Sequence, residues 1–400
     1  MTTFGDLAAR GSLLLTDGYR TKVSELGRPG YPILRVAEVS DGTMTPSLGD
    51  HVREEYRGQI GAKLSQAGDV LLTTKGTVGR RAIVPASDTR FVYSPQLCFF
   101  RVLDQTIDNR WLYYWLGGAD FWSQALGVSQ QTDMAPYVSL RDLRAIHVDL
   151  PPVAEQRAIA ATLGALDDKI ESNRRAIDLE NELAASMLST GGTAVRVGDM
   201  ASVAKGLSYK GVHLESGHWA GVVPMLNLAN FGKSGQMVPH GTKHYSGAFK
   251  QSHILKGMDL VVANTDLTQN REILGRAFLV PPKLAGAIHT HHTTLVCFRK
   301  GAEDLAPFLW AQMQSREFRD RAQGYATGTT VCALPVEALL DFEFSVPTNA
   351  AATASKAISL LDHSWQLESE VAGLKRLRDA LLPELLSGRI CVLPDEGMGS

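Results

Sequence analysis

Positive charge, paired cysteines and long apolar runs are all scarce in this 400-residue sequence. The formal net charge is −2, so a nucleic-acid surface would require a local concentration of Lys and Arg. The four cysteines form no C-x-x-C pair, which argues against a zinc knuckle or a disulfide framework and fits reduced thiols. No apolar run reaches the length of a membrane span, and the N-terminus lacks the pattern of a secretory signal. We therefore expect a soluble, cytoplasmic protein.

What the sequence does contain is an internal repeat. Hydrophobic residues make up 44% of the chain and charged residues 20%, values typical of folded domains. Five segments recur in the same order, with offsets that drift only by small insertions. The matched pairs are Pro32 with Pro224, Asp69 with Asp259, 79–85 with 275–281, Cys98 with Val296 (a shift of 198 positions), and Pro151 with Pro347. The chain is therefore interpreted as a tandem duplication.

Each half follows one plan. Short apolar segments punctuated by Gly and Pro predict strands, and a helical stretch, a polar loop, a last strand and a long helix follow them. The predicted fold class is α+β, with two tandem-repeated mixed α/β globules of roughly 150 residues, a normal domain size, separated by two long helices.

The first long helix is predicted from 151 to about 189, where Gly191 and Gly192 end it. Its length of roughly 36 residues corresponds to about 54 Å. Apolar residues recur in steps of three and four, the spacing of a heptad seam. The first seam comprises Ile159, Leu163, Leu166, Ile170, Ile177, Ala184 and Met187, with Asn173 and Glu180 as its polar members.

The second long helix, at about 351–387, has a less regular seam with Gly373 inside it and Pro383 near its end. A 150-residue globule is too small to cover either stripe, but the two stripes can bury each other. We therefore expect an antiparallel coiled coil with pseudo-two-fold symmetry that holds the halves apart. Asn173 is either a register-setting polar residue of this seam or a solvated side chain slightly off it. The second seam comprises Ile358, Leu361, Trp365, Leu374, Leu377, Leu381 and Leu385.

Three segments carry a resemblance to a known family. Residues 150–160, which read LPPVAEQRAIA, together with 166–175, closely resemble the central region of type I restriction-modification DNA specificity (S) subunits. Residues 381–390 resemble the C-terminal close of that family, and 68–79 are similar to the body of its target-recognition domains. The second helix departs from the pattern, because 346–351 replace the Pro-Pro-x-x-Glu-Gln repeat. This departure puts equal docking of partners on the two helices in doubt.

The resemblance implies a non-catalytic subunit that binds double-stranded DNA. Each target-recognition domain would read one half of a bipartite sequence, while the helices set the spacing and dock two methyltransferase subunits. The partners, including restriction/translocase subunits, would supply the chemistry with S-adenosylmethionine, ATP and Mg, and this chain would bind no cofactor. The implied boundaries are target-recognition domain 1 at 1–150, a spacer helix at 151–190, target-recognition domain 2 at 191–347, a second spacer helix at 348–390 and a tail at 391–400.

Candidate DNA contacts are polar residues on Gly-containing loops that occupy matching places in the two halves. For each loop the alternative is an ordinary solvated surface, since surface loops vary in any case. The candidates in the first half are Tyr19, Arg20, Lys22, Lys75, Thr77, Arg80, Arg81, Gln130, Gln131 and Thr132. Those in the second half are Tyr209, Lys210, Thr268, Gln269, Asn270, Arg271, Arg276, Thr329 and Thr330.

Partner docking and helix packing are assigned to residues on the two long helices. They are Glu155, Gln156, Arg157, Ile159, Leu163, Leu166, Ile170, Leu374, Leu377 and Leu381.

Catalytic and metal motifs are missing. There is no methyltransferase cofactor loop, and 76–79 lack the Gly-Lys-Ser/Thr end of a phosphate loop. His289, His291 and His292 have no carboxylate or cysteine at ligand spacing, and strand alternation would point the last two to opposite faces, so strand-end histidines are expected and no metal. Asp167 and Asp168 diverge on a helix, which favours a solvated face or a partner contact. An interaction scaffold or orphan subunit of the same fold is the alternative function, and a lone enzyme is disfavoured.

Overall fold

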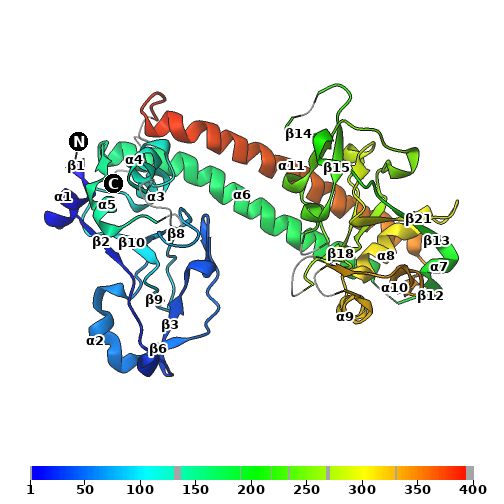
Figure 1. Cartoon of the computed structure of the whole chain (residues 1–400), viewed down its shortest axis with the longest axis horizontal. Helices are drawn as coiled ribbons and strands as arrows, with labels where there is room; N and C mark the ends of the chain where they lie inside the picture. Colours follow the sequence, from blue (N-terminus) through cyan, green and yellow to red (C-terminus); the bar gives the residue numbers. More distant parts are fainter. Residues whose placement is uncertain are drawn as a thin grey trace. The chain divides into compact units, whose positions relative to one another are not determined.

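The computed structural model describes residues 2–129, 137–189, 191–217, 219–232, 235–266, 271–328 and 331–392. The chain divides into two compact units, Met1–Lys169 with Leu374–Ser400 (unit 1) and Ile170–Gly373 (unit 2). Figure 1 shows that each unit mixes strands and helices. The predicted domain boundaries stay predictions, but each unit takes half of each long helix because those halves pack into its core.

Unit 1 is built on a four-stranded antiparallel sheet with the order β2-β10-β7-β8. Its apolar strands are buried on both faces, because residues alternate between two cores along each strand. Val70, Leu72 and Phe100 enter the core on the helical side, whereas Leu71 and Phe99 enter the core on the other side. The strands are β2 (Leu13–Asp17), β10 (Leu97–Val102), β7 (Val70–Thr73) and β8 (Arg81–Ile83).

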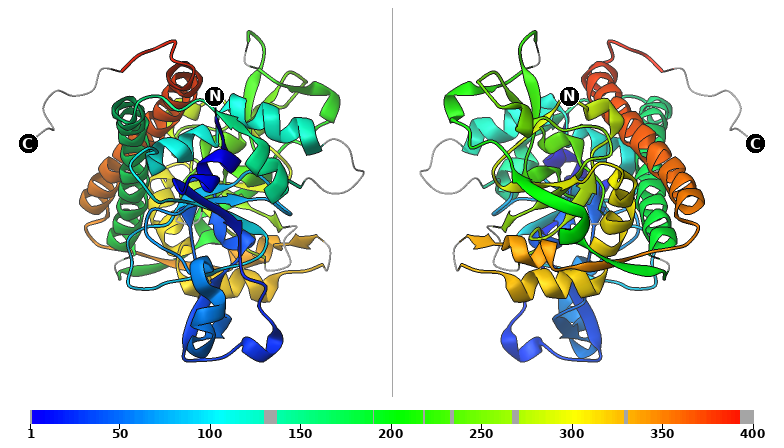
Figure 2. Two further views of the ribbon diagram at one scale, coloured as in Figure 1. Left: turned by 90° about the vertical axis from the view of Figure 1, so that its left-hand side faces the viewer. Right: turned by 90° about the vertical axis from the view of Figure 1, so that its right-hand side faces the viewer.

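Helices cover one side of this sheet and small sheets cover the other (Figure 2). The helical side holds α1 (Phe4–Ala9), α3 (Asn109–Trp115), α4 (Ala119–Ser129), α5 (Leu140–Ala145) and the pair β1 (Thr2–Thr3) with β11 (His147–Val148). The other elements are the sheet β6-β3-β9 (His51–Arg53, Gly30–Leu34, Val92–Tyr93), the hairpin β4–β5 (Val39–Ser40, Thr43–Met44) and α2 (Arg57–Ile60).

A buried ion pair ties the sheet of unit 1 together. The Asp69 carboxylate is fully buried and accepts two hydrogen bonds of 2.7 Å from the Arg101 guanidinium, whose side chain is 8% exposed. The Tyr93 hydroxyl donates a third bond of 2.6 Å to the same carboxylate. Burial, followed by the Asp69 charge, raises the pKa of Tyr93 far above its ordinary value. The three side chains thus form a hydrogen-bonded cluster within the buried part of unit 1.

Unit 2 has a central sheet with the corresponding order, β13-β21-β17-β19. These strands are β13 (Ala201–Lys205), β21 (Thr293–Phe298), β17 (Leu260–Ala263) and β19 (Ala277–Leu279). The accompanying helices are α7 (Val197–Met200), α8 (Ala306–Met313), α9 (Arg316–Tyr325) and α10 (Val336–Leu340). The smaller sheets are β12–β23 (Thr193–Arg196, Glu343–Val346), β14-β16-β15-β20 (Leu214–Glu215, Lys243–Tyr245, Val223–Leu226, Ile288–His289) and β18–β22 (Thr265–Asp266, Cys332–Ala333).

Strand register corrects one of the matches made from the sequence. Leu97 pairs with Thr73 in unit 1, and Thr293 pairs with Ala263 in unit 2. Because Thr73 and Ala263 end equivalent strands, Leu97 corresponds to Thr293, and the shift is 196 positions instead of 198. The error of two residues kept every side chain on the correct face, which is why the apolar pattern did not reveal it. Arg101 therefore corresponds to Cys297.

The long helices are α6 (Val153–Leu188) and α11 (Ala350–Leu386), within two residues of their predicted limits. In unit 1, Ile159 and Leu163 of α6 share a core with Leu385 of α11. In unit 2, Ala184 of α6 lies in one core with Leu361 of α11.

The structure decides between the two alternatives for the polar seam residue Asn173. Asn173 is only 3% exposed, so the solvated alternative is wrong, and its Nδ2 has no hydrogen-bond partner. The buried polar pair is instead formed by Asn181, whose Nδ2 donates to Ser364 Oγ at 2.9 Å. Leu377 is 48% exposed and does not belong to the packed stripe, whereas Leu374 and Leu166 are half-buried.

Candidate nucleic-acid interface

The strand ends along one edge of the central sheet of unit 1 carry loops that the sequence indicated as candidate DNA contacts. In an antiparallel sheet, the end of β2, the start of β10, the end of β7 and the start of β8 all lie at the same edge. The loop after β2 (18–22) and the loop between β7 and β8 (74–80) therefore flank the turn 94–96 that leads into β10. Backbone hydrogen bonds join the three, from Tyr19 to Tyr93 (2.7 Å) and from Thr74 to Gln96 (3.2 Å).

A glycine is required where the first of these loops crosses the turn. A Cβ on Gly18 would lie 2.1 Å from the Ser94 carbonyl oxygen, and one on Gly206 in unit 2 would lie 2.3 Å from the His289 carbonyl oxygen. No side chain fits at either distance, so both positions require the close backbone approach that only glycine allows. The same constraint at equivalent places indicates the same loop geometry in both units.

Lys75 is the most accessible cation of the 74–80 loop. Its Nζ lies 4.7 Å from the centre of the Tyr137 ring, and the Val138 amide donates to the Thr74 carbonyl at 3.2 Å. The loop therefore lies against Tyr137 and Val138. Thr77 is exposed on the same loop. The candidates Gln130, Gln131 and Thr132 lie outside the described residues.

Arg80 at the end of this loop and Arg81 at the start of β8 are engaged inside unit 1. Arg81 is 13% exposed and donates to the Tyr113 carbonyl (3.0 Å) and to Asp41 (3.3 Å). Arg80 donates to the Val39 carbonyl at 3.2 Å. These contacts fasten the loop to the hairpin β4–β5 and to α3, a use that the sequence did not suggest. DNA contact by either arginine stays a prediction.

The loop after β2 carries two exposed cations next to the half-buried ring of Tyr19. Tyr19 is half-buried against the core formed by Ile33, Val52 and Ile60, and burial raises its pKa. Arg20 and Lys22 are exposed. Exposed cations on a loop whose backbone is already held in place can contact phosphate without first having to order the loop.

Unit 2 repeats the arrangement with different side chains. Leu207 donates to the His289 carbonyl (2.7 Å), and the Asn264 amide donates to the His292 carbonyl (3.1 Å), so the turn 290–292 again lies between two loops. Lys210 is exposed, and Lys243 donates to the Tyr209 hydroxyl at 2.7 Å. Lys243 and the two turns are site residues that sequence reasoning missed. The signal available was that the turns join matching strands while differing in sequence.

The remaining candidates of unit 2 flank the pair β18–β22. Arg271 donates to the Gln323 carbonyl (3.1 Å), and Arg276 donates to the Glu272 (2.6 Å) and Gly232 carbonyls, so both are held by backbone. Burial lowers the pKa of Arg276. The candidates Thr268, Gln269, Asn270, Thr329 and Thr330 lie outside the described residues.

The histidines differ from the expected strand geometry. His291 and His292 lie in a turn, and their ring centres are 3.9 Å apart, so they do not point to opposite faces. His292 Nδ1 is 2.9 Å from Thr265 Oγ1. His289 lies in β20, fully buried, and burial lowers its pKa to about 4. Within the described part of the chain, no three His, Cys, Asp or Glu residues gather as metal ligands.

Gln156 belongs to the residues assigned to partner docking and helix packing, and its contacts are those of helix packing. It is fully buried, accepts from the Asp108 amide (2.8 Å), and donates to the carbonyls of Thr106 (3.1 Å) and Pro151 (2.8 Å). It therefore anchors α6 to unit 1 and is not available to a partner. Its neighbours Glu155 and Arg157 are half-buried and exposed, respectively.

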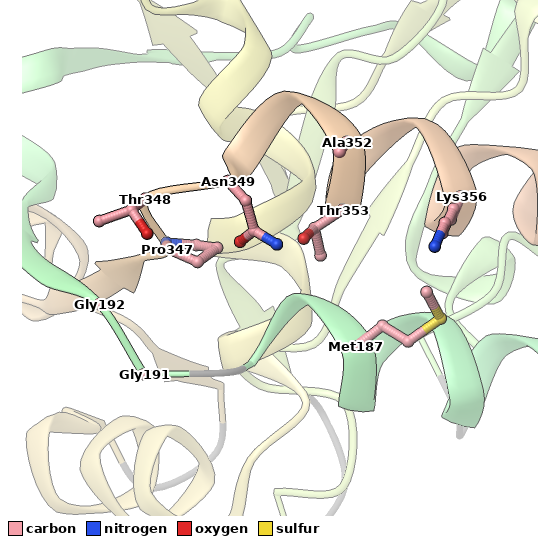
Figure 3. Close-up of a pocket in the computed structure, with 9 residues that line it drawn as sticks. All are labelled: Met187, Gly191, Gly192, Pro347, Thr348, Asn349, Ala352, Thr353 and Lys356. Atoms are coloured by element: carbon pink, nitrogen blue, oxygen red, sulfur yellow. The ribbon is translucent and has the colours of Figure 1, made fainter.

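The equivalent position in unit 2, Ala352, lines an open hollow of about 510 Å³ between the start of α11 and the end of α6 (Figure 3). Its lining residues are Met187, Gly191, Gly192, Pro347, Thr348, Asn349, Ala352, Thr353 and Lys356. Figure 3 shows the side chains of Asn349 and Thr353 close together at this hollow. Unit 2 thus lacks the polar anchor of unit 1.

Asp167 and Asp168 of α6 both have partners within unit 1. Asp167 accepts from the Tyr114 hydroxyl (2.7 Å) and from Arg378 of α11 (2.8 Å), so it links both long helices to α3. Asp168 accepts from Arg110 at 3.0 Å and is 69% exposed. The solvated face expected for both residues therefore holds only for Asp168.

A rigid sheet edge that gathers glycine turns, exposed cations and polar side chains defines a candidate nucleic-acid-binding protein. Residues 17–181 match the family model described as the type I restriction modification DNA specificity domain. This part of the chain is therefore similar to the DNA specificity domain of type I restriction-modification systems.

One solved structure of low sequence identity has a similar fold, and a second match is weaker. The S subunit of a type I restriction-modification system from M. genitalium is 14% identical, with 96% of this chain and 94% of that chain covered and a TM-score of 0.55. An HsdS subunit from Thermoanaerobacter tengcongensis is 15% identical, with 95% and 98% covered and a TM-score of 0.33. No curated protein matches the chain significantly. None of the helices in the described ranges is long and apolar enough to cross a membrane.

Proposed function

We propose that the chain is the DNA-recognition subunit of a type I restriction-modification complex and that each unit reads one half of a bipartite target. The observation that carries this proposal is the recurrence of one sheet edge in both units, with equivalent glycine-dependent loops and different side chains on them. Two readers that share a backbone and differ in side chains are suited to two different half-sites.

The long helices are the proposed spacer and docking elements for two methyltransferase subunits. In support, Asp167 meets Arg378 in unit 1 and Asn181 meets Ser364 in unit 2, the order of contacts that an antiparallel coiled coil requires. The full length of α6 corresponds to about 54 Å, enough to separate half-sites about one helical turn of DNA apart, on the order of 34 Å. The buried Gln156 anchor would fix the first reader to this spacer.

The chemistry is assigned to partners. Adenine methylation with S-adenosylmethionine and ATP-dependent, Mg-dependent restriction would take place in methyltransferase and restriction/translocase subunits, while this chain binds double-stranded DNA and no cofactor. The site residues described above fit recognition, because they offer hydrogen-bonding side chains and exposed cations.

The test is binding of DNA by the complex with its methyltransferase subunits, measured over a range of salt concentrations. Lys75→Ala should weaken target and random DNA alike and reduce the slope of log K against log salt by about 1, because one phosphate contact is lost. Arg81→Ala is the contrast: its side chain is engaged internally, and it should mainly lower stability. An unchanged salt slope for Lys75→Ala would remove the 74–80 loop from the interface.

Because the net charge is only −2, the alternative function is a scaffold or orphan subunit of the same fold that does not read DNA. A complex that assembles normally and binds target and random duplexes equally would favour this alternative.

A further inference from the structure

The turns 94–96 and 290–292 occupy the centre of the candidate interface in their units. On one side of the turn in unit 1, the amides of Gly18 and Tyr19 donate to the carbonyls of Leu97 and Tyr93, respectively. On the other side, both the amide and the hydroxyl of Thr74 donate to the Gln96 carbonyl at 3.2 Å. These contacts fix the backbone of the turn on two sides. A side chain that leaves such a turn toward solvent starts from a rigid base.

The turn of unit 2 is fixed at the same positions. The His291 amide donates to the Leu207 carbonyl at 3.0 Å, and the Asn264 side chain donates to the His291 carbonyl at 3.2 Å. The Thr265 hydroxyl adds a contact of 2.9 Å to His292 Nδ1. With a shift of 196 positions, His291 and His292 correspond to Pro95 and Gln96.

The inward residues of the two turns are alike and the outward residues are not. Ser94 and Thr290 are both buried hydroxyl residues, 5% and 1% exposed, and the hydroxyl oxygen of each has no hydrogen-bond partner among the described residues. In contrast, Gln96 is exposed in unit 1, and His291 is exposed with His292 half-buried beside it in unit 2. A common scaffold with interchangeable outward residues is the arrangement that sequence reading requires.

The outward side chains have the chemistry of base recognition. A glutamine amide donates and accepts at once, which matches the acceptor and donor that adenine presents in the major groove. A neutral imidazole has one donor and one acceptor; in His292, Nδ1 already contacts Thr265, which leaves Nε2 for a base, whereas no bond of this kind involves the exposed His291 ring in the described residues. Burial, followed by the nearby His291 and Lys243 charges, lowers the pKa of His292, so the neutral ring is favoured.

We propose that these turns are base-reading elements, in which Gln96 contacts a base of the half-site bound by unit 1, while His291 and His292 contact bases of the half-site bound by unit 2. This inference rests on the proposed function and makes it specific. It assigns sequence discrimination to the turns and leaves phosphate contact to exposed cations such as Lys75 and Lys210.

The experiment measures binding of the complex with its methyltransferase subunits to the target duplex and to duplexes with single base-pair substitutions in each half. Gln96→Ala should reduce discrimination roughly tenfold to a hundredfold at positions in one half only, the range expected for loss of a specific base contact. The double variant H291A/H292A should do so in the other half only. Neither variant should change the salt slope or the affinity for random DNA.

Gln96→His and His292→Gln serve as second variants that keep a hydrogen-bonding side chain, and each should alter the preferred base instead of abolishing preference. Lys75→Ala is the matched control, because it should lower the salt slope and leave discrimination intact. If the wild-type complex reads its target and no turn variant changes the base preference, the inference is overturned. A reduced salt slope with intact discrimination overturns it in favour of phosphate contact. A wild-type complex that discriminates no base would instead refute the proposed function itself.

Discussion

Replacing Asp69 with asparagine tests the buried ion pair of unit 1 against its counterpart in unit 2. The Asp69 carboxylate is fully buried and accepts from Arg101 twice and from Tyr93 once. In Asp69→Asn, the amide nitrogen would face donors, and the Arg101 guanidinium, 8% exposed, would lose its compensating charge. Removing one partner of a buried pair costs about 3–5 kcal/mol. For a unit of this size, such a loss lowers the midpoint of thermal unfolding by about 6–20 °C.

Asp259 is the matched control because it occupies the same place in unit 2 with Cys297 where unit 1 has Arg101. Its carboxylate accepts from the Lys256 amide at 2.7 Å, and burial raises its pKa above the ordinary 3.8. A raised carboxyl pKa gives stability below the unfolded-state value that is lost as the pH rises through the folded-state value. Asp259→Asn should therefore be neutral or stabilising at pH 7, and its difference from wild type should shrink as the pH falls toward 4.

The assay is denaturant unfolding of the full chain together with hydrogen exchange, which reports each unit separately. Asp69→Asn should accelerate exchange in β7 and β10, and Asp259→Asn should not do so in β17 and β21. Equal destabilisation of the two units by the two substitutions would refute the reasoning that the Arg101 charge makes the difference.

Two further substitutions follow from the repeat. Gln156→Ala should lower the free energy of unfolding by about 2–4 kcal/mol, since three hydrogen bonds of about 1 kcal/mol each are lost and their buried partners stay unpaired. In contrast, Ala352→Gln should change the free energy of unfolding by less than about 0.5 kcal/mol, because the position is exposed. A comparable loss in both variants would show that Gln156 does not anchor α6. Gly206→Ala should displace the turn 290–292 and weaken DNA binding by the complex, because its Cβ would overlap the His289 carbonyl; the exposed Gly211→Ala, with open space around it, is the control.

Much of the fold was predictable because it depends on local patterns. The strands β7 and β17 follow from apolar runs behind a Gly-Asp or Met-Asp pair, and both long helices end within two residues of their expected limits. The repeat itself was visible since the two units keep the same order of strands. Register was less secure, because a slip of two residues leaves every side chain on its face.

The site was only partly predictable because its geometry depends on contacts between distant residues. Arg81 reads as an exposed loop cation, yet its partners Asp41 and Tyr113 lie about 30–40 positions away along the chain. Gln156 lies inside a family motif that suggests docking, and only the structure reveals its bonds to Thr106 and Asp108. The central turns gave no local signal, because their importance arises from loops that meet there.

Recognition by two independent readers is tested most directly by exchanging one of them. A chimera in which residues 1–150 are replaced by the corresponding domain of a known type I specificity subunit would be expressed with the proposed methyltransferase partners, and the methylated sequence would be determined across the host genome. We expect a new sequence in one half of the methylated target, with the other half and the spacing between the two halves unchanged. A change in both halves, or in neither, would contradict it.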